Sequence, residues 1–222
     1  MLAYRTEIPT PRRRGRPSKT DINASMDIRA AALKAFGRAG FQGTSIADIA
    51  QLAGVAKPLV HYHFESKEVL WEAAVTDAVA TLMGEMSSFR QGLNTLPIQD
   101  LLRQISRQLV VFASRHPALV HIVVDETAKG GPRAQWLQEH FLLPSYAVAK
   151  SLLNGIAMMQ SPTMAPLPVE HIVPIVLGVM NFAFMEAEVI RKAYGVDVYS
   201  DDYIDRHGEL LFQLIRSFLV KT

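Results

Sequence analysis

The sequence contains no cysteine. Disulfide bonds, cysteine-ligated metal sites and cysteine nucleophiles are therefore excluded. A chain without cysteine suits a reducing compartment, and we expect it to lie in the cytoplasm.

Long apolar runs are also missing. The longest apolar stretch, residues 172–185, contains Pro174 and Asn181 and is shorter than the roughly 20 apolar residues that a membrane span needs. The first twenty residues carry six basic side chains and no apolar run behind them, which argues against a secretory signal. No membrane partner is expected.

Net charge is small, at +2, but it is unevenly distributed. Residues 1–20 hold six basic groups and one acidic group, whereas residues 71–222 hold 12 basic and 15 acidic groups. A basic front beside a mildly acidic remainder predicts that only the front of the chain meets a polyanion.

The 222 residues are 49% hydrophobic and 20% charged, as in an ordinary folded protein. Apolar residues recur at spacings of three and four, and no convincing strand alternation competes with them. We therefore predict an all-α fold with a flexible basic arm (residues 1–20), a helix-turn-helix domain called the head (21–70), and a helical ligand-binding and dimerisation domain called the body (71–222).

The head shows three short helical patterns. The first runs from Ile28, and Gly40 is suited to end it. Ser45 and Asp48 have the spacing of a capping box, which predicts a second helix from Ser45. Gly54 supplies a turn before the third segment, residues 56–63.

Beyond the head, residues 67–91 run without a strong breaker and predict a helical strut about 35 Å long at about 1.5 Å per residue. Proline and glycine breaks separate the later predicted helices. Those helices cover residues 98–115, 117–125, 133–159, 169–194 and 203–220.

The third segment has the chemistry of a DNA-reading helix, with donors beside small or apolar groups. Its candidate contacts are Lys57, Pro58, Leu59, His61, Tyr62 and His63. Thr44 and Ser45 lie at the start of the second helix, where N–H groups and the helix dipole favour a phosphate. Two histidines two residues apart diverge on a helix, so no metal is expected there.

Four stretches of the head resemble the TetR family of bacterial transcriptional regulators. They read A-F-G-R-A-G-F from residue 35, T-S-I-A-D-I-A from 44, A-G-V-A-K from 53 and H-Y-H-F-E-S-K-E-V-L from 61. The resemblance covers residues 25–72. It departs inside the third segment, where many relatives have Gly-Thr-Leu in place of Pro58, Leu59 and Val60, and tyrosine in place of His61.

The resemblance implies a homodimeric regulator, most often a repressor, that a small molecule releases from its DNA operator. It places six residues at positions that usually contact DNA, namely Thr44, Ser45, Lys57, Tyr62, His63 and Lys67. It also implies a dimer interface built from the two C-terminal helices. The residues alone leave open that these helices form an internal core instead.

The arm contains Arg14-Gly15-Arg16-Pro17, which resembles the core of an AT-hook that lies in the minor groove of A·T-rich DNA. A basic tail without a defined partner is the simpler reading. Because the arm adjoins the head, we favour DNA contact by Arg12, Arg13, Arg14 and Arg16.

The body has no motif for phosphate binding or nucleophilic catalysis, so neither an enzyme nor a cofactor is expected. Its large apolar side chains would ordinarily fill a core, but they would also line a cavity between helices for a largely apolar effector. The candidate ligand contacts are Phe89, Phe112, His116, His121, Trp136, Tyr146, Met159, Met180, Asn181 and Phe184.

Other functions remain open. The protein could be an activator, or a small-molecule carrier or chromatin component in which the head is only a general DNA-binding unit. Sequence-specific footprinting separates a transcriptional regulator from a carrier or a general chromatin component.

Overall fold

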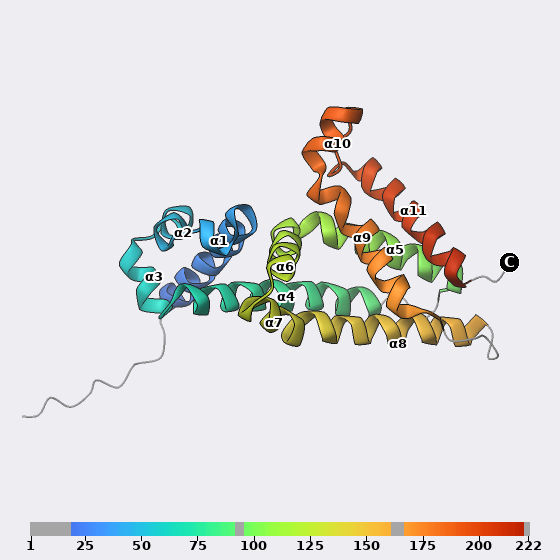
Figure 1. Cartoon of the computed structure of the whole chain (residues 1–222), viewed down its shortest axis with the longest axis horizontal. Coiled ribbons are helices and arrows are strands. Elements are labelled where there is room, and N and C mark those ends of the chain that lie inside the picture. The colour runs from blue at the N-terminus through green and yellow to red at the C-terminus, as the bar shows by residue number, and fades with distance from the viewer. Residues whose placement is uncertain (1–18, 92–95, 161–166, 220–222) are drawn as a thin grey trace, which may run out of the picture.

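A computed structural model describes residues 19–91, 96–160 and 167–219, and within these ranges the chain is helical and contains no strand (Figure 1). The head comprises α1 (Lys19–Gly43), α2 (Ile46–Ala53) and α3 (Lys57–His63), followed by the strut α4 (Lys67–Gln91). The body continues with α5 (Ile98–Arg115), α6 (Pro117–Lys129), α7 (Pro132–Leu137), the π-helical segment η1 (Gln138–Leu142), α8 (Leu143–Gln160), α9 (Val169–Met185), α10 (Ala187–Tyr194) and α11 (Asp201–Leu219).

Local signals in the head produce the predicted boundaries. Ser45 caps α2 through a complete capping box with Asp48, and Gly54 ends α2 in the left-handed conformation at φ 68° and ψ 27°. The Ser66 hydroxyl accepts the backbone N–H of Val69 at 3.1 Å and so caps α4. The strut covers the predicted residues, 67–91.

The first helix begins earlier than predicted. It begins at Lys19, inside the segment predicted to be an arm. At Gly40 the helical backbone is interrupted, as predicted, by a positive φ of 69° with ψ 172°, and a short further helical turn runs from there to Gly43.

Two long helices predicted in the body are interrupted. The helix predicted over residues 133–159 contains the π-helical segment η1. The helix predicted over 169–194 breaks at Glu186 into α9 and α10. In the described residues no single helix is both long and apolar enough to cross a membrane, and α9 with α10 meets that test only as a pair bent by 69°.

Two hydrophobic cores hold the molecule together. The first joins α1–α3 to the start of α4 and continues into the body through Leu119, Ile122 and Leu137. The second joins α5, α9 and α11. Because the buried residues Trp71 to Ala78 of α4 belong to the first core, that core crosses the boundary predicted after residue 70.

Candidate nucleic-acid interface

The third helix presents one side to solvent and anchors the other. Val60 is fully buried and Phe64, just after the helix, is also buried, so both hold α3 against α1 and α2. The side chains of Lys57, Pro58 and His61 are exposed, as the DNA-reading hypothesis requires. Figure 1 places α3 at the end of the molecule away from α11.

Tyr62 is the most accessible aromatic side chain of the head, at 68% exposure, and it meets His63 edge-on with ring centroids 5.1 Å apart. Leu59 and His63 are only half-buried at the edges of the exposed side. The Nε2 atom of His63 is buried without a hydrogen-bond partner among the described residues. The exposed surface of α3 therefore combines a cation, an aromatic hydroxyl and small apolar groups.

Ser45 is exposed at the N-terminus of α2, but its polar groups are already engaged. Its hydroxyl donates to Asp48 Oδ2 at 2.6 Å and its backbone N–H donates to the same oxygen at 2.9 Å. These hydrogen bonds lower the pKa of the Asp48 carboxyl. A phosphate approaching this helix end would meet the Asp48 carboxylate, which already interacts with the helix dipole.

Thr44 requires a correction, because its side chain is only 3% exposed. Its hydroxyl lies 2.8 Å from the Gly40 carbonyl oxygen and 3.1 Å from that of Ala35. The predicted phosphate contact through this hydroxyl is wrong for the structure described, since the hydroxyl holds the end of α1.

Lys67 also differs from its prediction. Its Nζ donates to the carbonyl oxygens of Phe41 and Thr44, each at 3.0 Å, and lies 4.3 Å from the centroid of the Phe41 ring. Carbonyl groups at the C-terminus of a helix attract cations, and here Lys67 satisfies two of them. The amine fastens α4 to α1 rather than pointing outward to DNA.

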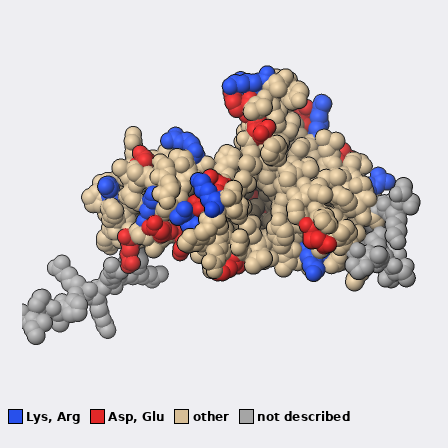
Figure 2. Space-filling model, in the orientation of Figure 1, with Lys and Arg blue, Asp and Glu red and all other residues tan. Residues whose placement is uncertain are grey.

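The four predicted arm contacts, Arg12, Arg13, Arg14 and Arg16, lie outside the described residues. Within the described part of the chain, no group of three His, Cys, Asp or Glu side chains could hold a metal ion. Figure 2 shows charged side chains crowded over the head and its junction with the body, whereas much of the visible body surface is uncharged.

The structure does not gather the predicted ligand contacts around one cavity. Trp136 packs against Trp71 beside the first core, with ring centroids 5.5 Å apart, whereas Phe184 and Met180 belong to the second core. Phe112 is buried and Tyr146 is exposed. Three of these residues thus pack with two separate cores, and which body residues contact an effector stays a prediction.

The polar candidates are also dispersed. His116 Nε2 lies 3.4 Å from Glu85 Oε2 and joins the α5–α6 junction to the strut. Asn181 donates to the Leu177 carbonyl oxygen at 2.8 Å within α9. The side chains of Phe89 and Met159 lie outside the described residues.

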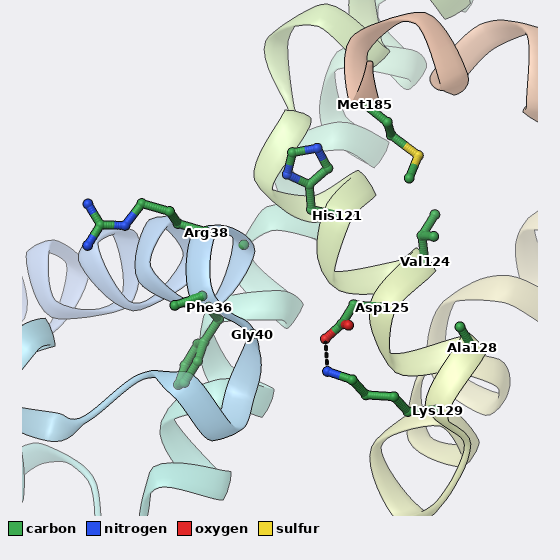
Figure 3. A pocket seen from close by; sticks show the side chains of 11 residues that line it. Phe36, Arg38, Gly40, His121, Val124, Asp125, Ala128, Lys129 and Met185 are labelled. Carbon is green, nitrogen blue, oxygen red and sulfur yellow. Dashed lines mark hydrogen bonds and ion pairs between the residues drawn. The ribbon is translucent and has the colours of Figure 1, made fainter. Parts of the chain in front are cut away.

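His121 lies instead in an open groove between α1 and α6 (Figure 3). The groove is lined by the last turns of α1, by α6 and by Met185 at the end of α9. On the α6 side of the groove, Lys129 Nζ and an Asp125 carboxylate oxygen form an ion pair at 2.6 Å, four residues apart on the same helix. This groove separates head from body at the surface.

The sequence did not predict a second contact between head and body. The Arg133 guanidinium of α7 lies over the Phe41 ring of α1, with its Cζ 3.9 Å from the centroid. Arg133 also pairs with the buried carboxylate of Glu126, its Nε 2.9 Å from Oε1. No spacing rule signals this contact, because residues 41, 126 and 133 meet only in the folded chain.

Comparisons with known sequences agree with this geometry. The family model described as "Bacterial regulatory proteins, tetR family" matches residues 28–74. The transcriptional regulator RutR of Escherichia coli O157:H7 is 28% identical over 72% of this chain and 73% of its own length. RutR of Escherichia coli K12 is 30% identical, and its match covers 53% of this chain and about half, 54%, of that relative.

Solved structures share the fold. A TetR-family regulator from Mesorhizobium loti superposes with a TM-score of 0.64 at 19% identity, covering 91% of this chain and 98% of the other. FadR from Bacillus subtilis, solved in complex with stearoyl-CoA, gives 0.66 at 13% identity over 88% and 99% of the two chains. The family model identifies residues 28–74 as a TetR-family helix-turn-helix domain, and over most of its length the chain is similar in sequence or fold to TetR-family transcriptional regulators.

Proposed function

We propose that the protein is a homodimeric repressor that reads its operator with α3 and that a small molecule releases from DNA. The observation that carries the proposal is the exposed side of α3, where Lys57, His61 and Tyr62 face solvent while Val60 is fully buried beneath them. A braced helix with exposed donors is the arrangement that reaches base edges in the major groove.

The DNA-reading side chains can be tested with a duplex that the full-length protein selects from a random DNA library, called here the selected duplex. Lys57→Ala and Tyr62→Phe remove a cation and a hydroxyl from the exposed side of α3. We expect Lys57→Ala to lower the affinity for the selected duplex and to reduce the salt dependence of binding by about one phosphate contact. We expect Tyr62→Phe to lower the affinity about tenfold, as for the loss of one good base or phosphate contact.

Lys150→Ala is the matched control, because Lys150 is an exposed lysine on α8. Fluorescence anisotropy at physiological salt measures the affinity of each variant and of the wild type for the selected duplex. If Lys57→Ala and Tyr62→Phe both bind the selected duplex as tightly as the wild type, α3 is not the reading helix.

The dimer proposal is supported by an apolar stripe on α9. Ile175, Gly178 and Phe182 are exposed at helical spacing, and Phe182 is 57% exposed. Exposed apolar patches of this kind mark interfaces, and two copies related by a two-fold axis would cover each other's stripe. By contrast, α11 turns Leu211 and Ile215 toward the second core. We therefore assign to α9 the larger part of an interface that the family resemblance places on both C-terminal helices.

Phe182→Glu tests this interface, since it would place a charge at its centre. We expect a dimer in the wild type and a monomer in the variant by sedimentation equilibrium. Leu143→Glu on α8, where Leu143 is also exposed, is the control and should remain dimeric. A dimeric Phe182→Glu variant would refute the assignment of the interface to α9.

Response to an effector is supported by the structural likeness to FadR, whose solved structure contains stearoyl-CoA. We propose that a largely apolar small molecule binds the body, and that the body has no catalytic role. A thermal-shift screen of hydrophobic metabolites tests this, because a ligand of the folded state raises its stability.

Release from DNA has a reciprocal consequence. If an effector weakens DNA affinity by some factor, the selected duplex must weaken effector affinity by the same factor. Titration with an effector found in the screen, in the presence and absence of the selected duplex, measures how the duplex changes the affinity for the effector. The reverse titration measures how the effector changes the affinity for the duplex. An effector affinity that the duplex leaves unchanged would contradict induced release, and so would a duplex affinity that the effector raises, since the effector would then promote DNA binding.

A further inference from the structure

Phe41 lies at the point where the head meets the body. This residue comes directly after the kink of α1 at Gly40. Its side chain is only 4% exposed, and its ring stacks on the ring of Phe36 with the centroids 5.6 Å apart. Two cations from different elements approach this ring: Lys67 Nζ at 4.3 Å and Arg133 Cζ at 3.9 Å from its centroid. A cation within about 6 Å of an aromatic face is attracted to it.

On the head side, the backbone of residues 41–44 connects the kinked end of α1 to the start of α2 and is bound by Lys67. Lys67 binds the carbonyl oxygens of Phe41 and Thr44, and Thr44 directly precedes the Ser45 cap of α2. Because α2 and α3 share the first core with α1, a displacement of this segment would displace the exposed side of α3.

On the body side, Arg133 is held by a buried carboxylate. Glu126 on α6 is only 2% exposed, and its Oε1 lies 2.9 Å from Arg133 Nε as an ionic contact that is not aligned as a hydrogen bond. The second oxygen, Oε2, has no hydrogen-bond partner among the described residues. Arg133 is thus the cation that compensates the Glu126 charge, and that pairing fixes the guanidinium beside Phe41.

We propose that Glu126 and Arg133 are positioning residues for DNA binding. Glu126 orients Arg133, the planar guanidinium of Arg133 lies against Phe41, and Phe41 fixes the head relative to α6 and α7. Neither residue belongs to the proposed DNA-contacting surface. The inference rests on the proposed reading of DNA by α3, and it makes the relative placement of α6 and α7 a determinant of DNA affinity.

Arginine and lysine differ at such a site, because a guanidinium stacks on a ring as a plane whereas an ammonium is a point charge. Arg133→Lys therefore keeps the charge beside Glu126 and removes the stacked plane. Glu126→Gln keeps the side-chain shape and removes the charge that orients Arg133. Phe41→Leu keeps an apolar side chain and removes the aromatic face.

We expect Arg133→Lys and Glu126→Gln each to weaken binding of the selected duplex about tenfold, within the usual range of coupling between sites. The double variant should lose little more than the larger single loss, since both act through one contact. Phe41→Leu should show a similar loss. Affinity for an unrelated duplex should stay nearly constant, because phosphate contacts that are independent of sequence remain.

Controls come from Glu188→Gln and Arg191→Lys, which alter an exposed ion pair of the same types in α10 with Nη2 and Oε1 2.7 Å apart. These should bind the selected duplex as the wild type does. Circular dichroism of every variant reports its helical content.

Two results would overturn the inference. One is an Arg133→Lys variant that binds the selected duplex with wild-type affinity. The other is a parallel loss of affinity for both duplexes with loss of helical signal in all three variants, which would show a role in folding alone. If the wild type selects no duplex at all, the proposed function fails and this inference falls with it, so the two failures are distinguishable.

Discussion

At the scale of single residues, the same side-chain chemistry serves different purposes depending on burial. Thr44, Lys67 and Tyr62 all stand at positions where the family resemblance implies DNA contact. Only Tyr62 is strongly exposed, whereas the polar atoms of Thr44 and Lys67 bind carbonyl oxygens inside the head. Sequence shows which residues can donate hydrogen bonds, but the acceptor depends on the tertiary arrangement of α1 and α4.

We predict that Thr44→Val destabilises the protein. The change removes a buried hydroxyl whose one hydrogen lies within reach of two carbonyl oxygens, those of Gly40 and Ala35, and leaves them without that donor. The free energy of unfolding should fall by about 1 to 3 kcal/mol, as for buried groups that lose a partner. Urea denaturation followed by circular dichroism measures it. The exposed Thr76 gives the control, Thr76→Val, which should stay within about 0.5 kcal/mol of the wild type.

The capping box of α2 predicts a dependence on pH. Hydrogen bonds from Ser45 lower the pKa of the Asp48 carboxyl in the folded state, so its contribution to stability is present above the unfolded pKa, near 3.8. That contribution is lost as pH falls through the lower, folded pKa. Asp48→Asn should therefore lose less stability than the wild type between neutral pH and about pH 3 in urea titrations. An identical pH dependence in the two proteins would contradict a capping role for the carboxylate.

At the scale of elements, the predictable features are the local ones. The Ser45 cap, the Gly54 turn and the bounds of α4 follow from residues within a few positions of each other, and the structure contains all three. The break at Glu186 and the π-helical segment η1 carry no strong breaker in the sequence. They depend on packing between distant helices, which periodicity does not describe.

The pattern of apolar residues likewise does not predict how distant helices pack against one another. Periodicity identified Trp136, Met180 and Phe184 as candidates for a cavity, yet these side chains pack near two different cores. Helical spacing indicates which face of a helix is apolar, but not which other helix covers it.

The closest approach of α1 to α6 gives a prediction about elements. A Cβ atom on Gly37 would lie 2.7 Å from the Ala118 Cα atom, so Gly37→Ala must push the two helices apart. We expect a loss of about 1 to 3 kcal/mol in the free energy of unfolding, as for overpacked cores, and weaker binding of the selected duplex.

Gly84 in α4 provides the matched control, because a Cβ there has no atom within 4 Å. Gly84→Ala should instead raise the free energy of unfolding by up to about 1 kcal/mol through helix propensity. Equal stabilisation by both substitutions would show that α1 and α6 are not in the tight contact described.

At the scale of the whole molecule, one core runs from the head into α6 and α7, and a second core joins α5, α9 and α11. The head is thus packed on the part of the body nearest to it rather than joined only through the strut. The exposed apolar stripe of α9 lies on a helix of the second core. Together these features support the proposed dimer, in which the body would determine the spacing of the two heads.

The most direct test is the footprint of the full-length protein on the selected duplex, measured at single-nucleotide resolution. Two reading helices related by a two-fold axis predict two symmetric half-sites whose centres lie about 34 to 36 Å apart, or a multiple of one helical turn. Phe182→Glu should abolish the paired protection at the same protein concentration. A single unpaired half-site for the wild type, or protection without sequence preference, would contradict a dimeric regulator that reads DNA with α3.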